Sequence, residues 1–156
     1  MTSPAEKQAL DFFHQGYSCA QSVLAPFAKD LGMDENTALR LASGFGAGVG
    51  RMRGTCGAFS SLVMVAGFCR GNTSGEAGEK EKIYTFVREL AERFRKEFGT
   101  LTCRELLQLQ EAPPEGARPH DRTETYYATR PCERCVAFCA RLAQESLREQ
   151  ALTSGQ

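Results

Sequence analysis

The chain has 156 residues, of which 42% are hydrophobic and 24% charged, the composition of a globular protein rather than a fibrous or disordered one. Nineteen Lys and Arg side chains balance nineteen Asp and Glu side chains, and zero net charge excludes broad electrostatic attraction to nucleic acid or anionic lipid. Seven cysteines, an odd number, are the unusual feature of a chain with no Trp and two His.

The sequence predicts neither a signal peptide nor a membrane span. The N-terminal segment lacks the basic stretch followed by an apolar stretch that is typical of signal peptides. The longest uncharged apolar stretch, from Thr55 to Cys69, is shorter than the roughly 18 residues that a spanning helix needs. We therefore expect a cytoplasmic protein, in which reduced cysteines serve as core, metal-binding or redox residues rather than as structural disulfides.

Apolar residues recur at helical spacing in the N-terminal part and predict three helices. The first stops at Gly16. The second runs from Cys19 to Leu31 and should be kinked by Pro26, which removes a backbone donor and crowds the preceding turn. The third begins after Asp34 and runs through Leu41.

A glycine-rich break separates these helices from the next ones. Five glycines between Gly44 and Gly54 interrupt regular structure, and a buried helix follows from Cys56 to about Cys69. A long amphipathic helix then carries an apolar stripe from Ile83 to Phe98. A further helix is expected to begin at Cys103.

The C-terminal part combines an irregular segment with one long helix. Residues 110–131 are rich in Pro, Gly and charge, which predicts a long excursion over the surface. The last helix runs from Pro131 to about Gln150, and residues 151–156 should form a frayed tail. Because no segment shows sustained alternation, we predict an all-α fold. Residues 1–150 would form one compact bundle of about six or seven helices, with the glycine-rich loop near the site.

Four cysteines fall in the first turn of a predicted helix. They are Cys19, Cys56, Cys103 and Cys132, and the residues before them are Ser18, Thr55, Thr102 and Pro131, which are typical of helix starts. Gln21 and Glu105 would complete capping boxes with Ser18 and Thr102. The positive end of a helix dipole favours a thiolate and lowers the thiol pKa, and thiolates bind metals, attack disulfides and hold iron–sulfur clusters.

The other three cysteines have the positions of core residues. Cys69 ends an apolar helix, and Cys135 and Cys139 lie on the apolar face of the last helix. Cys132, Cys135 and Cys139 share a helix face but would be spread along about 10 Å of its axis, too far for one small site to take all three easily. Cys135 is kept as a substitute for Cys132 in any site.

The glycine-rich segment matches no nucleotide-binding motif. Gly54 and Gly57 are candidates for positions where the backbone closely approaches a neighbouring helix or a prosthetic group. Arg51 and Arg53 are candidates to balance an anionic cluster or bind a small anion, or they are two exposed loop arginines. The two histidines form no metal-ligand spacing with a cysteine and are interpreted as surface or packing residues.

Several segments resemble a known family. They are GYSCAQSVLAPFAKDLG, the run ASGFGAGVGRMRGTCGAFSSLVMVAGF, a Cys before a later helix, and a final CxxxV. Over roughly residues 10–147 the chain resembles the redox-active proteins named for a C…GCAxxG…C…C pattern. The resemblance implies that the family's four defining cysteines correspond to Cys19, Cys56, Cys103 and Cys132. Where the family has a final glycine in CGAxxG, this chain has Ser61.

The resemblance implies redox activity that depends on the cysteines, and it specifies no substrate. The family is also similar to a region of split-Soret cytochromes, in which a cysteine-held iron–sulfur centre has been suggested. This chain has no C-x-x-C-H haem motif, so the cysteine part alone carries over.

Three functional hypotheses follow. In the first, Cys19, Cys56, Cys103 and Cys132 hold one iron–sulfur cluster for electron transfer or sensing. In the second, the same cysteines are redox-active thiols that cycle between dithiol and disulfide without a metal. In the third, they form a structural zinc site in a helical interaction protein, although gaps of 37, 47 and 29 positions differ from the short C-x2-4-C pairs typical of zinc.

The expected partners follow from the first hypothesis and from the composition. We expect an electron-transfer partner of unspecified identity, with no nucleic acid and no membrane span. The many apolar helix faces in a chain of this size are compatible with a homodimer.

Overall fold

The computed structural model describes residues 2–109 and 116–154, and within these ranges the chain is helical and contains no strand. The elements are α1 (Pro4–His14), α2 (Cys19–Leu24), the 3-10 helix η1 (Ala25–Phe27), α3 (Glu35–Ser43), α4 (Gly57–Arg70), α5 (Ala77–Phe98), α6 (Cys103–Leu106), α7 (Glu124–Thr129) and α8 (Cys132–Ser154). The all-α prediction is confirmed.

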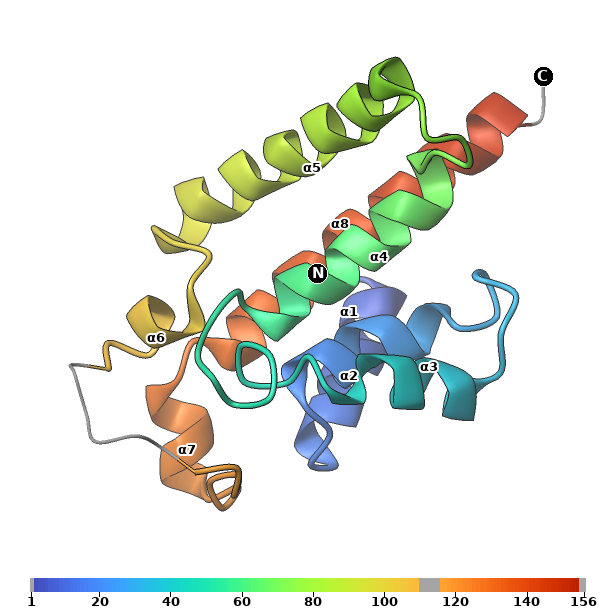
Figure 1. Ribbon diagram of the computed structural model, residues 1–156. Coiled ribbons are helices and arrows are strands. Elements are labelled where there is room, and N and C mark those ends of the chain that lie inside the picture. Colours follow the sequence, from blue (N-terminus) through green and yellow to red (C-terminus); the bar gives the residue numbers. More distant parts are fainter. Residues whose placement is uncertain (1, 110–115, 155–156) are drawn as a thin grey trace.

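Helices α4 and α8 form the centre of the fold. They lie side by side, with α1, α2 and α3 on one side and α5 on the other (Figure 1). Leu62 and Val65 of α4 and Val136 and Leu142 of α8 are fully buried in this core. The N-terminal ends of α4 and α8 lie at the same end of the molecule as α6 and α7 (Figure 1). The central pair therefore brings two helix starts together at one end.

An aromatic cluster attaches the long amphipathic helix α5 to this centre. The ring of Phe94 is fully buried and makes edge contacts with Phe59 of α4 and Phe138 of α8, at centroid distances of 5.7 and 6.0 Å. The α5 helix ends at Gly99, whose φ of +87° lies in the left-handed region that glycine adopts without strain. The predicted apolar stripe on this helix is thus its packing face.

The predicted kink at Pro26 is wrong, because the α-helix ends before the proline is reached. Helix α2 stops at Leu24, and Pro26 lies in the 3-10 helix η1. Proline has no N–H to donate to the helix ladder, which explains why the α-helical bonding does not continue through it. The turn that follows ends at Gly32, which has a φ of +74°.

Two boundary predictions near the C-terminus also need correction. The predicted excursion over residues 110–131 contains a helix, α7, whose first turn is capped by the side chain of Thr123 accepting from the Tyr126 N–H. Residues 110–115 of that segment lie outside the described residues. The predicted frayed tail is helical as far as Ser154, and residues 155–156 lie outside the described part.

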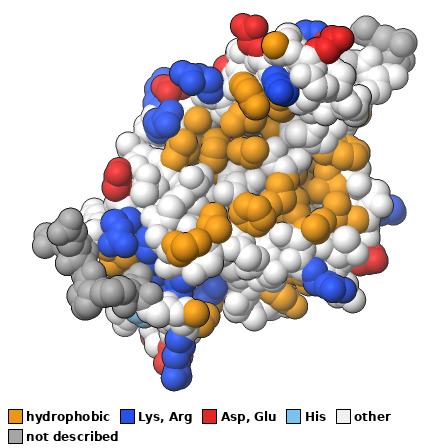
Figure 2. All heavy atoms as spheres, viewed as in Figure 1, with side chains coloured by type: hydrophobic (Ala, Val, Ile, Leu, Met, Phe, Trp, Pro, Cys, Tyr) orange, Lys and Arg blue, Asp and Glu red, His pale blue; other side chains and the backbone are white. Residues whose placement is uncertain are grey.

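Some large hydrophobic side chains remain exposed. Phe68 in α4 and Tyr84 in α5 are among them, and Figure 2 shows hydrophobic side chains gathered over these two helices. Among the described residues, no helix combines the length and apolar character that crossing a bilayer requires. A homodimer stays a prediction.

Truncation of Leu62 tests the central packing. Leu62→Ala should lower the free energy of unfolding by about 2–5 kcal/mol, because it leaves a cavity between helices that cannot fully collapse. Leu41→Ala, at a side chain that is 55% exposed, is the matched control and should cost about 0.5 kcal/mol or less. Urea unfolding followed by circular dichroism measures both, and equal losses would contradict the assigned core.

Candidate functional site

The four cysteines at predicted helix starts line one cavity. Its volume is about 480 Å³, and its walls come from α2, the glycine-rich loop, α4, α6, α7 and α8. The cysteines on its walls are Cys19, Cys56, Cys103, Cys132 and Cys135. Residues separated by 37, 47 and 29 positions in the sequence therefore share a single site. All seven cysteines are free thiols.

Backbone hydrogen bonds hold two of these cysteines side by side. The Cys56 N–H donates to the Leu101 carbonyl at 2.8 Å, and the Cys103 N–H donates to the Gly54 carbonyl at 2.7 Å. Thr55 and Thr102 form an isolated antiparallel bridge between the same two segments. This pairing places the start of α4 beside the start of α6. Gly54, a predicted cofactor-binding residue, thus acts through its backbone behind the cysteines and does not line the cavity.

The helix starts differ in how they are capped. Ser18 and Gln21 form the predicted capping box before Cys19, with both reciprocal bonds present. Before α4 the prediction is wrong, because Cys56 itself occupies the N-cap position expected for Thr55. The Thr102 side chain makes no capping bond, so the second predicted capping box is also wrong. At both positions the threonine instead takes part in the short antiparallel bridge between Thr55 and Thr102, which sequence periodicity does not reveal.

The glycine-rich loop has an unusual backbone conformation. Five consecutive residues, 47–51, have positive φ angles, and three of them are not glycine. Val49, with a φ of +68°, is an outlier for a β-branched residue, and such strain persists only where surrounding structure enforces it. The loop lines the cavity through Gly46, Ala47 and Gly50. Strain stored beside a cavity is characteristic of a functional site.

Close packing fixes Cys19 against the start of α4. A Cβ atom on Gly57 would lie 2.6 Å from the Phe45 carbonyl oxygen and 2.8 Å from the Cys19 sulfur, so a side chain here would displace the site. Ser61, which replaces the family's glycine, is fully buried and donates its hydroxyl proton to the Ala20 carbonyl at 2.6 Å. The departure from the motif therefore adds a bond between α4 and α2.

The expected lowering of thiol pKa is wrong for three of the four cysteines. Burial of the sulfur raises the pKa of Cys19 to about 12, and negative charge on Cys56 and Cys103 contributes in the same direction. Burial, followed by charge on the other three cysteines, raises the pKa of Cys132 to about 12. The Cys56 pKa is also raised well above 9.0, first by a hydrogen bond with Cys135 and then by burial.

The helix-start effect is present and is outweighed. Hydrogen bonds from the backbone amides of Ala47 and Ala58 lower the pKa of Cys19, and those of Ala58 and Phe59 lower that of Cys56. Desolvation and mutual repulsion among neighbouring thiolates are larger than these contributions. With their raised pKa values, Cys19, Cys56 and Cys132 are protonated thiols at neutral pH unless a cation compensates them.

The two candidate arginines occupy different environments on the cavity wall. Arg53 is 4% exposed, and its guanidinium donates to the Cys103 sulfur at 3.7 Å. Arg51 is half-buried and donates to the Gly116 carbonyl at 2.6 Å. The interpretation of both as exposed loop arginines is therefore wrong, and Arg53 directly faces a sulfur of the site.

The three cysteines assigned to the core separate into different cases. Cys139 is fully buried in the core, and Cys69 is half-buried and packs against the core. Cys135 is 1% exposed and also lines the cavity, in hydrogen-bond contact with Cys56. Among the described residues, no three His, Cys, Asp or Glu side chains converge closely enough to hold a single metal ion.

Residues of the α7 region complete the cavity and were not predicted from the sequence. Arg122, Tyr126 and Arg130 line it, and Tyr126 is close enough to Cys132 for the charge of that cysteine to raise the Tyr126 pKa, after burial. His120 lines the cavity too. His14 is exposed and pairs with Glu133 outside it, in agreement with the interpretation of this histidine as a surface or packing residue.

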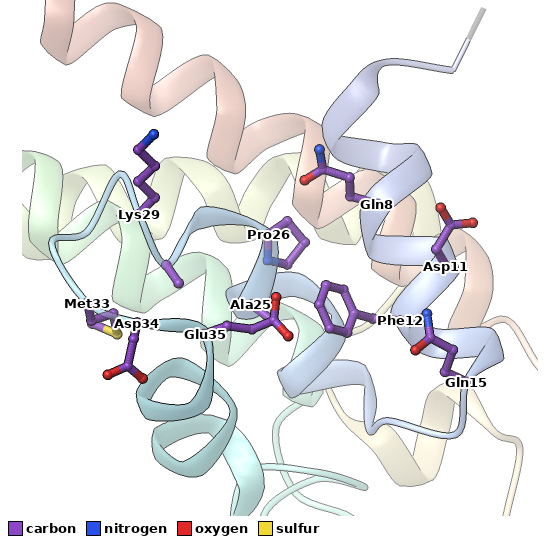
Figure 3. A pocket seen from close by; sticks show the side chains of 11 residues that line it. Gln8, Asp11, Phe12, Gln15, Ala25, Pro26, Lys29, Met33, Asp34 and Glu35 are labelled. Carbon is purple, nitrogen blue, oxygen red and sulfur yellow. The ribbon is translucent and has the colours of Figure 1, made fainter.

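A second cavity of about 470 Å³ lies between α1, η1 and the start of α3. Figure 3 shows Gln8, Asp11, Gln15 and Lys29 around its rim and the ring of Phe12 facing into it. None of its described lining residues is a cysteine, and the Asp34 carboxylate there accepts the bond that caps α3. The second cavity therefore presents no thiol for redox chemistry among its described lining residues.

Substitution of Gly57 tests the close approach to Cys19. Gly57→Ala should lower the free energy of unfolding by about 1–3 kcal/mol and change the alkylation rate of Cys19, because the new methyl group meets backbone and sulfur. Gly67→Ala in the same helix is the matched control. No atom lies near its added Cβ, so it should be neutral or stabilising by up to about 1 kcal/mol. Identical behaviour of the two variants would contradict the packing described.

The raised thiol pKa values predict slow alkylation in the metal-free protein. A thiol of pKa about 12 is protonated at pH 8, and its thiolate fraction keeps increasing as the pH rises toward 12. Iodoacetamide labelling of Cys19 and Cys132, followed by mass spectrometry, should therefore accelerate beyond pH 10. The same cysteines in urea are the control, and their labelling rate should be half-maximal near pH 9 and level off above about pH 10. A plateau below pH 9 in the folded protein would show that the helix starts dominate.

Comparison with known proteins identifies the family. The model of the family described as "Putative redox-active protein (C_GCAxxG_C_C)" matches residues 17–146, a range that contains all seven cysteines. Comparison with curated proteins and with solved structures found no significant match. Because the family model covers most of the 156 residues, the chain belongs to the C_GCAxxG_C_C family of redox-active proteins.

Proposed function

We propose that Cys19, Cys56, Cys103 and Cys132 hold an iron–sulfur cluster through which the protein transfers or senses electrons. The observation that carries the proposal is that four cysteines from distant parts of the sequence line one cavity. Four cysteine thiolates are the commonest set of protein ligands for such clusters. A cavity of about 480 Å³ has room for a polynuclear group as well as for a single ion.

The surroundings of the sulfurs fit a group that brings positive charge. Burial raises the thiol pKa values, so four thiolates in this cavity would repel one another without compensation. A bound metal deprotonates the thiols that coordinate it and removes that cost. A cluster would supply one-electron redox chemistry, whereas this chain supplies ligands, hydrogen-bond donors and exclusion of water.

Hydrogen bonds to the sulfurs would adjust the reduction potential. The amides of Ala47 and Ala58 hydrogen-bond to the Cys19 sulfur, and Arg53 donates to that of Cys103. Donors to cluster sulfurs stabilise the more negative, reduced state and raise the potential. Arg53 and the strained loop are therefore the parts of the chain expected to set the potential, and Arg51 and Gly57 border the same space.

Iron and sulfide analysis of anaerobically prepared protein tests this proposal. The protein should contain both, with visible absorption, and Cys→Ser at position 19, 56, 103 or 132 should reduce iron content by more than half. Cys69→Ser and Cys139→Ser are the controls and should keep the colour, because those thiols lie outside the cavity lining. A colourless protein without iron, even after reconstitution, would exclude the cluster.

Thiol–disulfide chemistry is a second candidate function, and the contact between Cys56 and Cys135 favours it. These two thiols are hydrogen-bonded to each other and face the same cavity. Hydrogen peroxide would oxidise one thiolate to a sulfenic acid, and the second thiol would displace water from it to form the disulfide.

Tryptic mapping of metal-free protein treated with peroxide tests this pairing. Cleavage after Arg134 separates Cys135 from Cys132, so a disulfide between Cys56 and Cys135 links peptides 54–70 and 135–141. Cys135→Ser should abolish this linked species, whereas Cys139→Ser and Cys69→Ser should retain it. Peptide 135–141 also contains Cys139. If Cys139→Ser abolished the linked species and Cys135→Ser did not, Cys139 would be the partner of Cys56 and the proposed pairing would be wrong.

A further inference from the structure

Three side chains from the α7 region form a compact unit on the cavity wall. The guanidinium carbons of Arg130 and Arg122 lie 4.4 and 4.9 Å from the centroid of the Tyr126 ring. All three residues are half-buried and line the same cavity as Cys132. Two cations are therefore held against one aromatic ring beside the cysteines.

The Arg122 guanidinium is fixed in place and still has donors to offer. It donates to the Phe13 carbonyl at 3.0 Å and to the Tyr17 carbonyl at 2.9 Å, and it stacks on the Phe13 ring. A guanidinium carries five N–H donors, so three remain beyond these two bonds. Because both carbonyls belong to the α1 end, the group is positioned before any ligand arrives.

Arg130 complements this fixed cation. Its guanidinium contacts the Tyr126 ring and makes no hydrogen bond or ion pair with any other described residue. Its N–H donors are thus available to a molecule in the cavity. The fork of a single guanidinium matches the paired oxygen atoms of a carboxylate or phosphate, and two such groups line this cavity.

The charge along the cavity is uneven. Arg51 and Arg53 also line it, and none of its described lining residues is Asp or Glu. The chain as a whole is neutral, so positive charge is concentrated here. Figure 2 shows Lys and Arg side chains at the end of the molecule that holds α6 and α7. Partial enclosure strengthens the attraction of these cations for an anion.

We propose that Arg122 and Arg130, held against the Tyr126 ring, form a binding site for a small oxyanion, the carboxylate or phosphate group of a small molecule, beside Cys132. This site is separate from the proposed cluster, because none of its three side chains is one of the cysteines proposed to bind the cluster. Binding does not depend on a cluster being present. It gives the cysteine cavity a preference for anionic small molecules.

Calorimetric titration tests the site with two probes, inorganic phosphate and citrate. The full chain is used as anaerobically prepared and again after iron and sulfide reconstitution, at constant ionic strength set with chloride. At least one probe should bind saturably with one site per chain. Arg130→Gln should weaken binding by about tenfold or more, because it removes charge-assisted hydrogen bonds. Arg130→Lys should recover part of the affinity.

Arg134→Gln is the matched control. Arg134 lies in the first turn of α8, four residues after Arg130. Its guanidinium is 5.4 Å from the Phe98 ring centroid, and it is not among the described lining residues of the cavity. This variant loses the same charge and the same kind of aromatic contact, and it should bind the probe as the unchanged protein does. If Arg134→Gln and Arg130→Gln weakened binding equally, the probe would be attracted by overall charge alone, and the proposal of a specific site would be overturned.

Nuclear magnetic resonance keeps the test decisive if Arg130→Gln fails to fold. Addition of phosphate to the unchanged protein should shift the amide signals of residues 122–132, while those of α5 stay in place. Absence of saturable binding of both probes overturns the oxyanion site and leaves the cluster proposal intact if iron is present. Saturable binding in a protein that takes up no iron supports the oxyanion site and excludes the cluster.

Discussion

The antiparallel contact between residues 54–56 and 101–103 is the constraint on which the site depends. Two backbone hydrogen bonds, between Cys56 and Leu101 and between Cys103 and Gly54, join the starts of α4 and α6 across more than forty residues of sequence. The packing of α4 against α2 and α8 then adds Cys19 and Cys132. A bundle that otherwise relies on side-chain packing thus uses backbone bonds at the place where its thiols meet.

Helix dipoles and burial act in opposite directions on the thiols. Backbone amides stabilise a thiolate at Cys19, but burial and neighbouring sulfurs raise its pKa to about 12. A site of this kind is unfavourable for four uncompensated thiolates and favourable for a cationic group that binds all of them. The same balance predicts slow alkylation of the metal-free protein, and the contact between Cys56 and Cys135 is the basis of the proposed disulfide.

The sequence predicts the helices and the four cavity cysteines because both depend on local patterns. Apolar periodicity and small polar residues before Cys19 mark a helix start that the structure also has. The sequence leaves Cys135 open between a core residue and a substitute for Cys132, since its place on an apolar stripe looks identical whether the stripe meets core or cavity. Arg122 and Tyr126 escape prediction from the sequence, because their position depends on the fold of a segment with a weak helical pattern.

A cysteine footprint tests most directly the proposal that one cavity holds one group through a defined set of thiols. The protein is alkylated before and after loading with iron and sulfide, and each cysteine is quantified by mass spectrometry. The proposal predicts that loading protects Cys19, Cys56, Cys103 and Cys132 together, while Cys69 keeps its reactivity. Unchanged labelling of these four cysteines, or protection spread equally over all seven, would contradict it.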